Sequence, residues 1–220
     1  MKRSKKAFGD FYFERKENPP NCLISHDETE LMARTRPQYA EHPTVCNICG
    51  GNNVQYVSNA LVYGRQYGSG YCYLCRTCRS FVGTHEPAPD IALGILADPK
   101  LRDLRKKCHT EAERLYVSEQ REGSRKRMTA LYFVLGQWLC MSPDQMHFAK
   151  MQEQDLMDAL TFMQAVKSFE YIFGGHRVRS IEMKDGSILR LPLRDDIEEK
   201  IRRWERETNA TSKAITRKVS

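Results

Sequence analysis

The sequence lacks a long apolar run, and this absence excludes a membrane-spanning protein. None of its 220 residues belongs to a stretch that approaches the roughly 18 uninterrupted apolar residues of a transmembrane helix. The basic first segment, MKRSKKAFGDFYFERKENPP, also lacks the apolar stretch and the small-residue cleavage site of a secretory signal. We therefore expect a cytoplasmic protein, in a bacterial or phage-infected cell, with no membrane partner.

Catalytic signatures are lacking as well. The chain contains neither an H-E-x-x-H sequence nor a phosphate-binding loop. A metal-dependent nuclease would have to use His85, Asp98 and His109, because histidine carries protons at neutral pH and carboxylates bind hydrolytic metals. Asp98 is better interpreted as a helix cap, and a lone histidine on a helix is more often structural. An enzyme is therefore the least favoured of three functional hypotheses.

The chain is rich in cysteine for a protein without an export signal. It has eight cysteines, and in a reduced cytoplasm such thiols stay free to bind metal. Four of them form two C-x-x-C pairs, Cys46 with Cys49 and Cys75 with Cys78, and Gly50 allows the tight turn after the first pair. A hairpin-length segment between the pairs can bring four thiolates around one tetrahedral ion. We predict one zinc ion, which is structural because four cysteines leave no position for water.

A fifth thiol complicates this assignment. Cys72 forms an overlapping C-x-x-C pair with Cys75, and one tetrahedral site cannot hold five thiols. We prefer CRTC because it pairs with CNICG as in a zinc ribbon, while a pairing of Cys72 with Cys78 remains an alternative. The other three cysteines have no partner at ligand spacing and are interpreted as small buried hydrophobes: Cys22, Cys108 and Cys140.

The pattern of apolar residues predicts an α+β fold. Aromatic and β-branched residues around Gly64, Gly68 and Gly70 indicate a hairpin between the two cysteine pairs. The Asp185-Gly186 pair predicts a second hairpin. The expected order is a flexible N-terminal arm over 1–43, a zinc ribbon-like module over 44–97, a helical unit over 98–173, a β-hairpin with an amphipathic helix over 174–207, and a disordered tail over 208–220.

The helical unit is expected to contain several helices. Asp98 predicts an N-cap with Pro99 at the first helical position, and Ser124 predicts the cap of a second helix. Ser142 begins an S-x-x-Q capping box and predicts a third. A further helix is expected through QDLMDALTFMQAVKSF. The apolar stripe of the first helix is expected to face the core: Leu101, Leu104, Cys108, Ala112 and Leu115.

A surplus of basic residues favours a polyanionic partner. The formal net charge is +7, and each phosphate that binds Lys or Arg releases condensed counterions. Tyr63, Tyr67, Tyr71 and Tyr73 could stack on bases, or they could pack a hairpin face. The charges could equally be a solvated surface. The candidate phosphate-binding residues are Arg65, Arg76, Arg79, Arg102, Arg105, Lys106 and Lys107.

Several motifs occur in order over residues 46–116. These are CNICG, then VYGRQYGSGYCYLCRTCRSFVGTHEP, LGILADPKLRDLRKKCH and AERLY, followed by SRKRMTALYFVLGQWLCMSPDQMHFAKM up to about residue 150. The run resembles a zinc-finger-containing family of uncharacterised proteins from bacteria and their phages. The resemblance implies a zinc-finger module and no established reaction. Relatives often carry Cys before the histidine of VG-x-H, where this chain has Thr84, so that position is not a general ligand.

Zinc-dependent nucleic-acid binding is the function that these features favour, in a regulatory or phage-related setting and with DNA or RNA as the partner. The alternative is a protein-interaction module or inhibitor that docks on a host protein, which mixed charge also fits. A stoichiometric protein partner that resists nuclease and moderate salt would distinguish the two.

Overall fold

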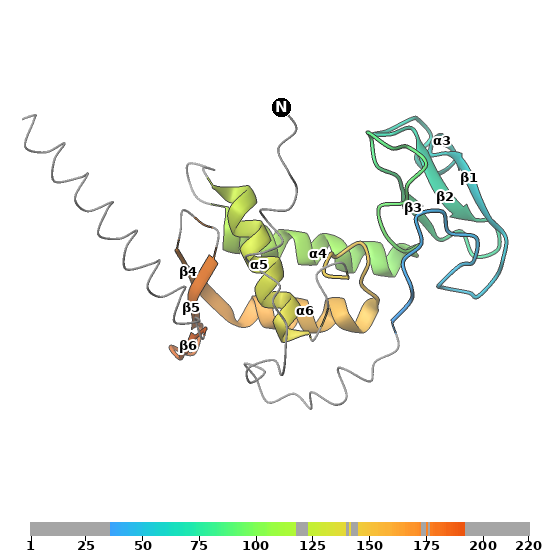
Figure 1. The fold of residues 1–220 in the computed structure, drawn as a ribbon. Helices are drawn as coiled ribbons and strands as arrows, with labels where there is room; N and C mark the ends of the chain where they lie inside the picture. Colours follow the sequence, from blue (N-terminus) through green and yellow to red (C-terminus); the bar gives the residue numbers. More distant parts are fainter. Residues whose placement is uncertain are drawn as a thin grey trace, which may run out of the picture.

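The protein is described by a computed structural model that covers residues 36–117, 123–139, 141, 145–172, 175 and 177–191. Two antiparallel sheets, each of three strands, lie at opposite ends of this part of the chain, and helices lie between them (Figure 1). The predicted α+β class is confirmed. Within the same residues, no helix combines the length and the apolar character needed to cross a bilayer.

The first sheet contains the predicted hairpin between the cysteine pairs. Its strands are β1 (Val54–Ser58), β2 (Tyr71–Cys75) and β3 (Phe81–Gly83), and a short helix, α3 (Ala60–Tyr63), follows β1. Strands β1 and β2 pair along their whole length, from Val54 opposite Cys75 to Ser58 opposite Tyr71. Because successive side chains of a strand point to opposite faces, β2 contributes to two separate small cores.

Helix α4 (Pro99–Tyr116) begins as the sequence predicts. The Asp98 carboxylate accepts a hydrogen bond of 2.7 Å from the backbone N–H of Leu101, and Pro99 occupies the first helical position. This cap satisfies one of the backbone donors that a helix start leaves without a partner. The predicted stripe is buried at four positions and half-buried at Leu104.

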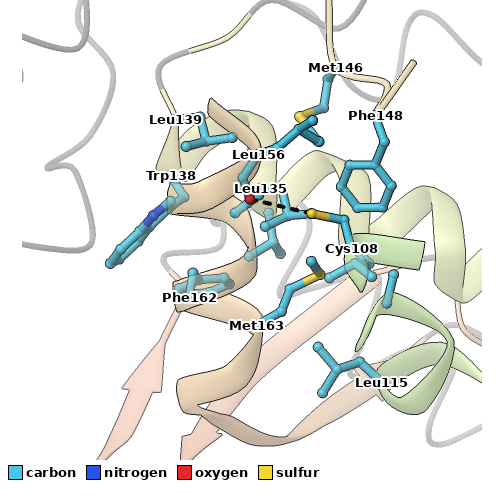
Figure 2. Close-up of a cluster of buried hydrophobic side chains, with 14 of the residues drawn as sticks. Cys108, Leu115, Leu135, Trp138, Leu139, Met146, Phe148, Leu156, Phe162 and Met163 are labelled. Carbon is cyan, nitrogen blue, oxygen red and sulfur yellow. Dashed lines mark hydrogen bonds between the residues drawn. The ribbon is translucent and has the colours of Figure 1, made fainter. Parts of the chain in front are cut away.

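Helices α5 (Ser124–Trp138) and α6 (Glu153–Ala165) complete the main hydrophobic core with α4. Figure 2 shows Trp138 and Phe162 on one side of this core and Phe148 on the other. The prediction that Ser124 caps α5 is wrong by one position. The cap residue is Gly123 at φ 73°, a left-handed conformation that glycine adopts without steric cost, and Ser124 begins the helix.

Two helical expectations fail after α5. Residues 145–150 form turns rather than the helix expected from Ser142, which itself lies outside the described residues. The His147 ring accepts the Ala149 N–H at 3.2 Å, and such local side-chain bonds compete with helix formation. The helix expected through residues 154–169 ends at Ala165, where the chain continues directly into a strand.

The second sheet consists of β4 (Val166–Ile172), β5 (Arg177–Met183) and β6 (Ile188–Arg190). The predicted turn at Asp185-Gly186 joins β5 to β6, with Gly186 at φ 88° and the Asp185 carboxylate accepting the Ser187 N–H at 2.9 Å. The expected terminal amphipathic helix and tail lie outside the described residues, as does most of the expected arm.

The zinc module, by which we mean residues 44–97, is joined to the helices at a close backbone contact. The N–H of Ile95 donates to the carbonyl of Ala149 at 2.9 Å, and the Arg105 guanidinium donates to the same carbonyl at 2.8 Å. At the end of the expected arm, Arg36 pairs with the buried Asp155 of α6 at 3.1 Å, and the Tyr39 hydroxyl donates to the Ala92 carbonyl. Residues 36–43 therefore contact both the zinc module and the helices.

Candidate metal centre

The four predicted ligand cysteines converge at the end of the first sheet. Their sulfur atoms all lie within 4.8 Å of one another. The Sγ atoms of Cys46 and Cys78 are 3.6 Å apart, and those of Cys49 and Cys75 are 3.7 Å apart. A tetrahedral zinc ion with Zn–S bonds of about 2.3 Å requires sulfur separations of about 3.8 Å. The four cysteines therefore fit one structural zinc ion.

The first cysteine pair is held by a turn that its own backbone closes. The N–H of Gly50 donates to the carbonyl of Cys46 at 2.8 Å, and the N–H of Cys46 donates back to the carbonyl of Gly51 at 2.8 Å. Gly50 has φ 72°, which confirms the prediction that this turn needs a residue that tolerates positive φ. Cys46 and Cys49 are thereby presented on the same side of the turn.

The second pair is held by the turn between β2 and β3. Cys75 is the last residue of β2, and its N–H donates to the carbonyl of Ser80 at 2.9 Å. The N–H of Arg79 donates to the carbonyl of Cys75 at 2.9 Å, and Arg79 has φ 65°, a left-handed conformation that is uncommon for a residue other than glycine. This turn brings Cys78 back beside Cys75.

Cys72 is not part of the cluster. It lies three residues before Cys75 on β2, so its side chain points to the opposite face of the sheet. There it is fully buried with Leu74 and Phe81, and burial raises the pKa of its thiol. The alternative in which Cys72 replaces a ligand is wrong.

The cysteines without a partner at ligand spacing are the remaining case. Cys108 is buried as predicted, and burial raises the pKa of its thiol to about 12. Cys22 and Cys140 lie outside the described residues.

Polar groups surround the sulfur atoms. The N–H of Ile48 donates to Cys46 Sγ at 3.4 Å, and the Ser80 hydroxyl lies 3.0 Å from Cys78 Sγ. Burial opposes ionisation of Cys78, but hydrogen bonds with the Ser80 side chain and backbone, and with the side chains of Cys46 and Cys49, outweigh it and lower the pKa of Cys78 to about 6. Hydrogen bonds to a cysteine sulfur favour its thiolate, which is the form that binds metal.

A comparison with protein-family models places the chain in a family. A model described as a zinc-finger-containing domain matches residues 42–166. The chain belongs to this zinc-finger-containing family. The matched residues include both cysteine pairs and helices α4 to α6, and they end where β4 begins. No curated protein and no solved structure matches the chain.

The candidate phosphate-binding residues of this zinc-finger-containing chain fall into two groups. Arg65, Arg76 and Arg79 are exposed on the zinc module. Lys106 and Lys107 are exposed on α4, where Lys107 pairs with the preceding turn's Asp103 at 2.9 Å. Side chains of this first group reach solvent, so they can meet a polyanion.

Arg102 and Arg105 form the second group, and their guanidinium groups are engaged inside the protein. Arg102 donates to the Ala97 carbonyl at 2.7 Å and covers the Phe81 ring at 4.2 Å, while Arg105 donates to the carbonyls of Ile95 and Ala149. These contacts join α4 to the zinc module. In this structure Arg102 and Arg105 thus serve a structural contact, and their role as phosphate-binding residues stays a prediction.

The four candidate stacking tyrosines differ in exposure to solvent. Tyr63 and Tyr67 are 52% and 69% exposed. Tyr71 is exposed but stacks on Tyr56, with the ring centroids 4.9 Å apart. Tyr73 is buried, and its hydroxyl donates to the Asp90 carbonyl at 2.6 Å. The interpretation of Tyr73 as a stacking residue is wrong, because its ring belongs to the core of the zinc module.

The three residues of the nuclease hypothesis each have their own, separate environment. Asp98 caps α4, and the His109 ring packs edge-on against Phe148 at 5.1 Å. His85 is exposed after β3. In the described part of the chain, the four cysteines form the only group of three or more potential ligands close enough to hold a metal. The sequence reasoning overlooked Ser80, although its place two residues after Cys78 was a usable signal.

Proposed function

We propose that the zinc module binds nucleic acid through the loop at residues 59–70. The side chain of Asn59, which is buried, fixes this loop from inside. Its amide donates to the Tyr67 carbonyl at 2.5 Å, and its carbonyl oxygen accepts the Tyr67 N–H at 3.2 Å. Because both bonds join the start of the loop to the backbone of Tyr67, they fix the path of the chain that carries Tyr63 and Tyr67.

The exposed rings of Tyr63 and Tyr67 carry the proposal. Their centroids are 6.2 Å apart, and Tyr63 is supported by edge-on contact with Phe81 at 5.5 Å. Aromatic rings held in place before binding lose little entropy when a base stacks on them. Stacking contributes about 1–3 kcal/mol per base and requires an unpaired base. Single-stranded DNA or RNA is therefore the expected partner.

Positive charge accompanies these rings. Arg65 lies between Tyr63 and Tyr67 in the loop and is exposed, and Arg76 and Arg79 are exposed beyond the far end of β2. Phosphate contacts by such residues supply affinity without sequence preference. We propose a regulatory or phage-related setting for this binding.

The test is binding of fluorescent single-stranded oligonucleotides to the full zinc-loaded chain, measured by anisotropy at several salt concentrations. The Tyr67→Ala change should weaken binding about 5- to 150-fold, which corresponds to about 1–3 kcal/mol of lost stacking. The Arg65→Ala change should make the logarithmic salt slope shallower by about one unit. Arg190→Ala, at an exposed arginine of the second sheet, is the matched control and should change neither value.

Absence of binding at low salt by folded, zinc-loaded protein would contradict the proposal. The second candidate is then a protein-interaction surface, which the exposed Leu61 beside Tyr63 favours. Tyrosine and arginine are enriched at the energetic centres of protein interfaces. In that case a stoichiometric complex that survives nuclease treatment should be lost in Tyr67→Ala as well.

A further inference from the structure

Ser80 places a buried hydroxyl beside two of the ligand cysteines. Its side chain is completely shielded from solvent. Its Oγ lies 3.0 Å from Cys78 Sγ and 3.1 Å from Cys46 Sγ. These sulfurs come from different cysteine pairs, so one hydroxyl bridges the two halves of the metal centre.

The backbone fixes the position of this hydroxyl independently of the sulfur atoms. The Ser80 carbonyl accepts the Cys75 N–H at 2.9 Å, which closes the turn between β2 and β3. The left-handed residue Arg79 and the first residue of β3, Phe81, lie on either side. The turn itself therefore places Ser80 beside the sulfurs.

A zinc centre with four cysteine ligands is stabilised by hydrogen-bond donors near its sulfur atoms. Four thiolates and one Zn²⁺ carry a net charge of −2, and a thiolate can only accept hydrogen bonds. In a buried site, a hydrogen bond to this negative charge is stronger than the same bond in water. The Ser80 hydroxyl lies within hydrogen-bond distance of both sulfurs and can donate its proton to either of them.

We propose that Ser80 is a positioning residue of the zinc centre. It holds Cys46 and Cys78 at their separation of 3.6 Å and stabilises their thiolate charge. It thereby raises zinc affinity and lowers the reactivity of both sulfurs toward electrophiles. Outer hydrogen-bond partners of metal ligands elsewhere change metal affinity about 10- to 100-fold when they are removed.

The test uses the full chain and a chromophoric chelator that competes for zinc. Ser80→Ala should weaken zinc binding about 10- to 100-fold. Thr84→Val is the matched control, because Thr84 is another buried hydroxyl of the zinc module but its contacts are the Ser69 hydroxyl, at 2.6 Å, and the Tyr71 carbonyl. That variant should keep the wild-type zinc affinity even if it lowers stability.

A second readout is the rate at which the cysteine sulfurs are alkylated. Iodoacetamide should alkylate the zinc-loaded Ser80→Ala protein faster than the wild type, because its thiolates have lost a hydrogen-bond donor. Unchanged zinc affinity and unchanged alkylation in Ser80→Ala would overturn the proposal, as would an equal loss of affinity in Thr84→Val. If Ser80→Ala does not fold, Ser80→Thr decides: retained affinity supports the proposal, and a loss as large as that caused by removing a ligand overturns it.

Discussion

Removal of zinc by a chelator should unfold the zinc module and leave the helical core folded. The module has two small buried clusters, and two of the six buried residues in the larger one are the ligands Cys46 and Cys75. Zinc binding contributes about 10–16 kcal/mol to the folding of such modules. The helical core, by contrast, is an extensive apolar cluster made by α4, α5, α6 and the second sheet. The Cys75→Ser variant should behave like the chelated protein.

Amide hydrogen exchange separates the two parts in this experiment. Chelation should abolish protection of the β1–β2 pairs, such as Tyr56 opposite Tyr73, and should leave the amides of α4 and α6 protected. Cys72→Ala is the matched control, since it removes a buried thiol of the same strand that is not a ligand. It should retain zinc at wild-type affinity. Full β1–β2 protection after chelation, or zinc loss in Cys72→Ala, would contradict the account.

Replacement of Gly94 by alanine should break the junction between the zinc module and the helices. An added Cβ would lie 2.0 Å from the carbonyl oxygen of Ala149 and 2.4 Å from its carbonyl carbon. These are backbone atoms, so a side-chain rotation cannot relieve the clash. The neighbouring hydrogen bond from Ile95 to Ala149 would be lost as well. We expect a loss of about 2–4 kcal/mol, from about 1–3 for overpacking and about 1 for the hydrogen bond.

Urea unfolding of the zinc-loaded protein measures this loss. Gly83→Ala is the control, because its added Cβ would meet only the end of the Leu93 side chain, at 3.4 Å. That side chain is exposed and can move, so the control should change the free energy of unfolding little. Equal stability of the two variants would mean that the contact between Gly94 and Ala149 does not hold the parts together.

The features that the sequence predicts correctly are those fixed by neighbouring residues. A C-x-x-C pair with Gly50 after it defines a turn by local backbone geometry, and the structure places Cys46 and Cys49 on that turn. Asp98 followed by Pro99 likewise specifies a helix start within one turn of chain. The choice of Cys75 over Cys72 depends on the alternation of a strand, which is also local.

The features that the sequence does not predict depend on distant partners. Arg105 resembles any surface arginine of a basic helix until Ala149, 44 residues later, provides its acceptor. Tyr73 is buried by distant partners, among them the carbonyl of Asp90 and the ring of His42, which the pattern of its own strand does not reveal. The end of α6 at Ala165 is set by pairing of β4 with β5, and the apolar pattern of β4 alone also fits a helix.

The most direct test of a zinc centre with four cysteine ligands is X-ray absorption spectroscopy at the zinc edge of the purified, metal-quantified protein. The account predicts one zinc ion per chain, with a single shell of four sulfur atoms at about 2.3 Å. A shell that contains nitrogen or oxygen at about 2.0–2.2 Å, or a zinc module that is folded without zinc, would contradict the assignment of Cys46, Cys49, Cys75 and Cys78 as its ligands.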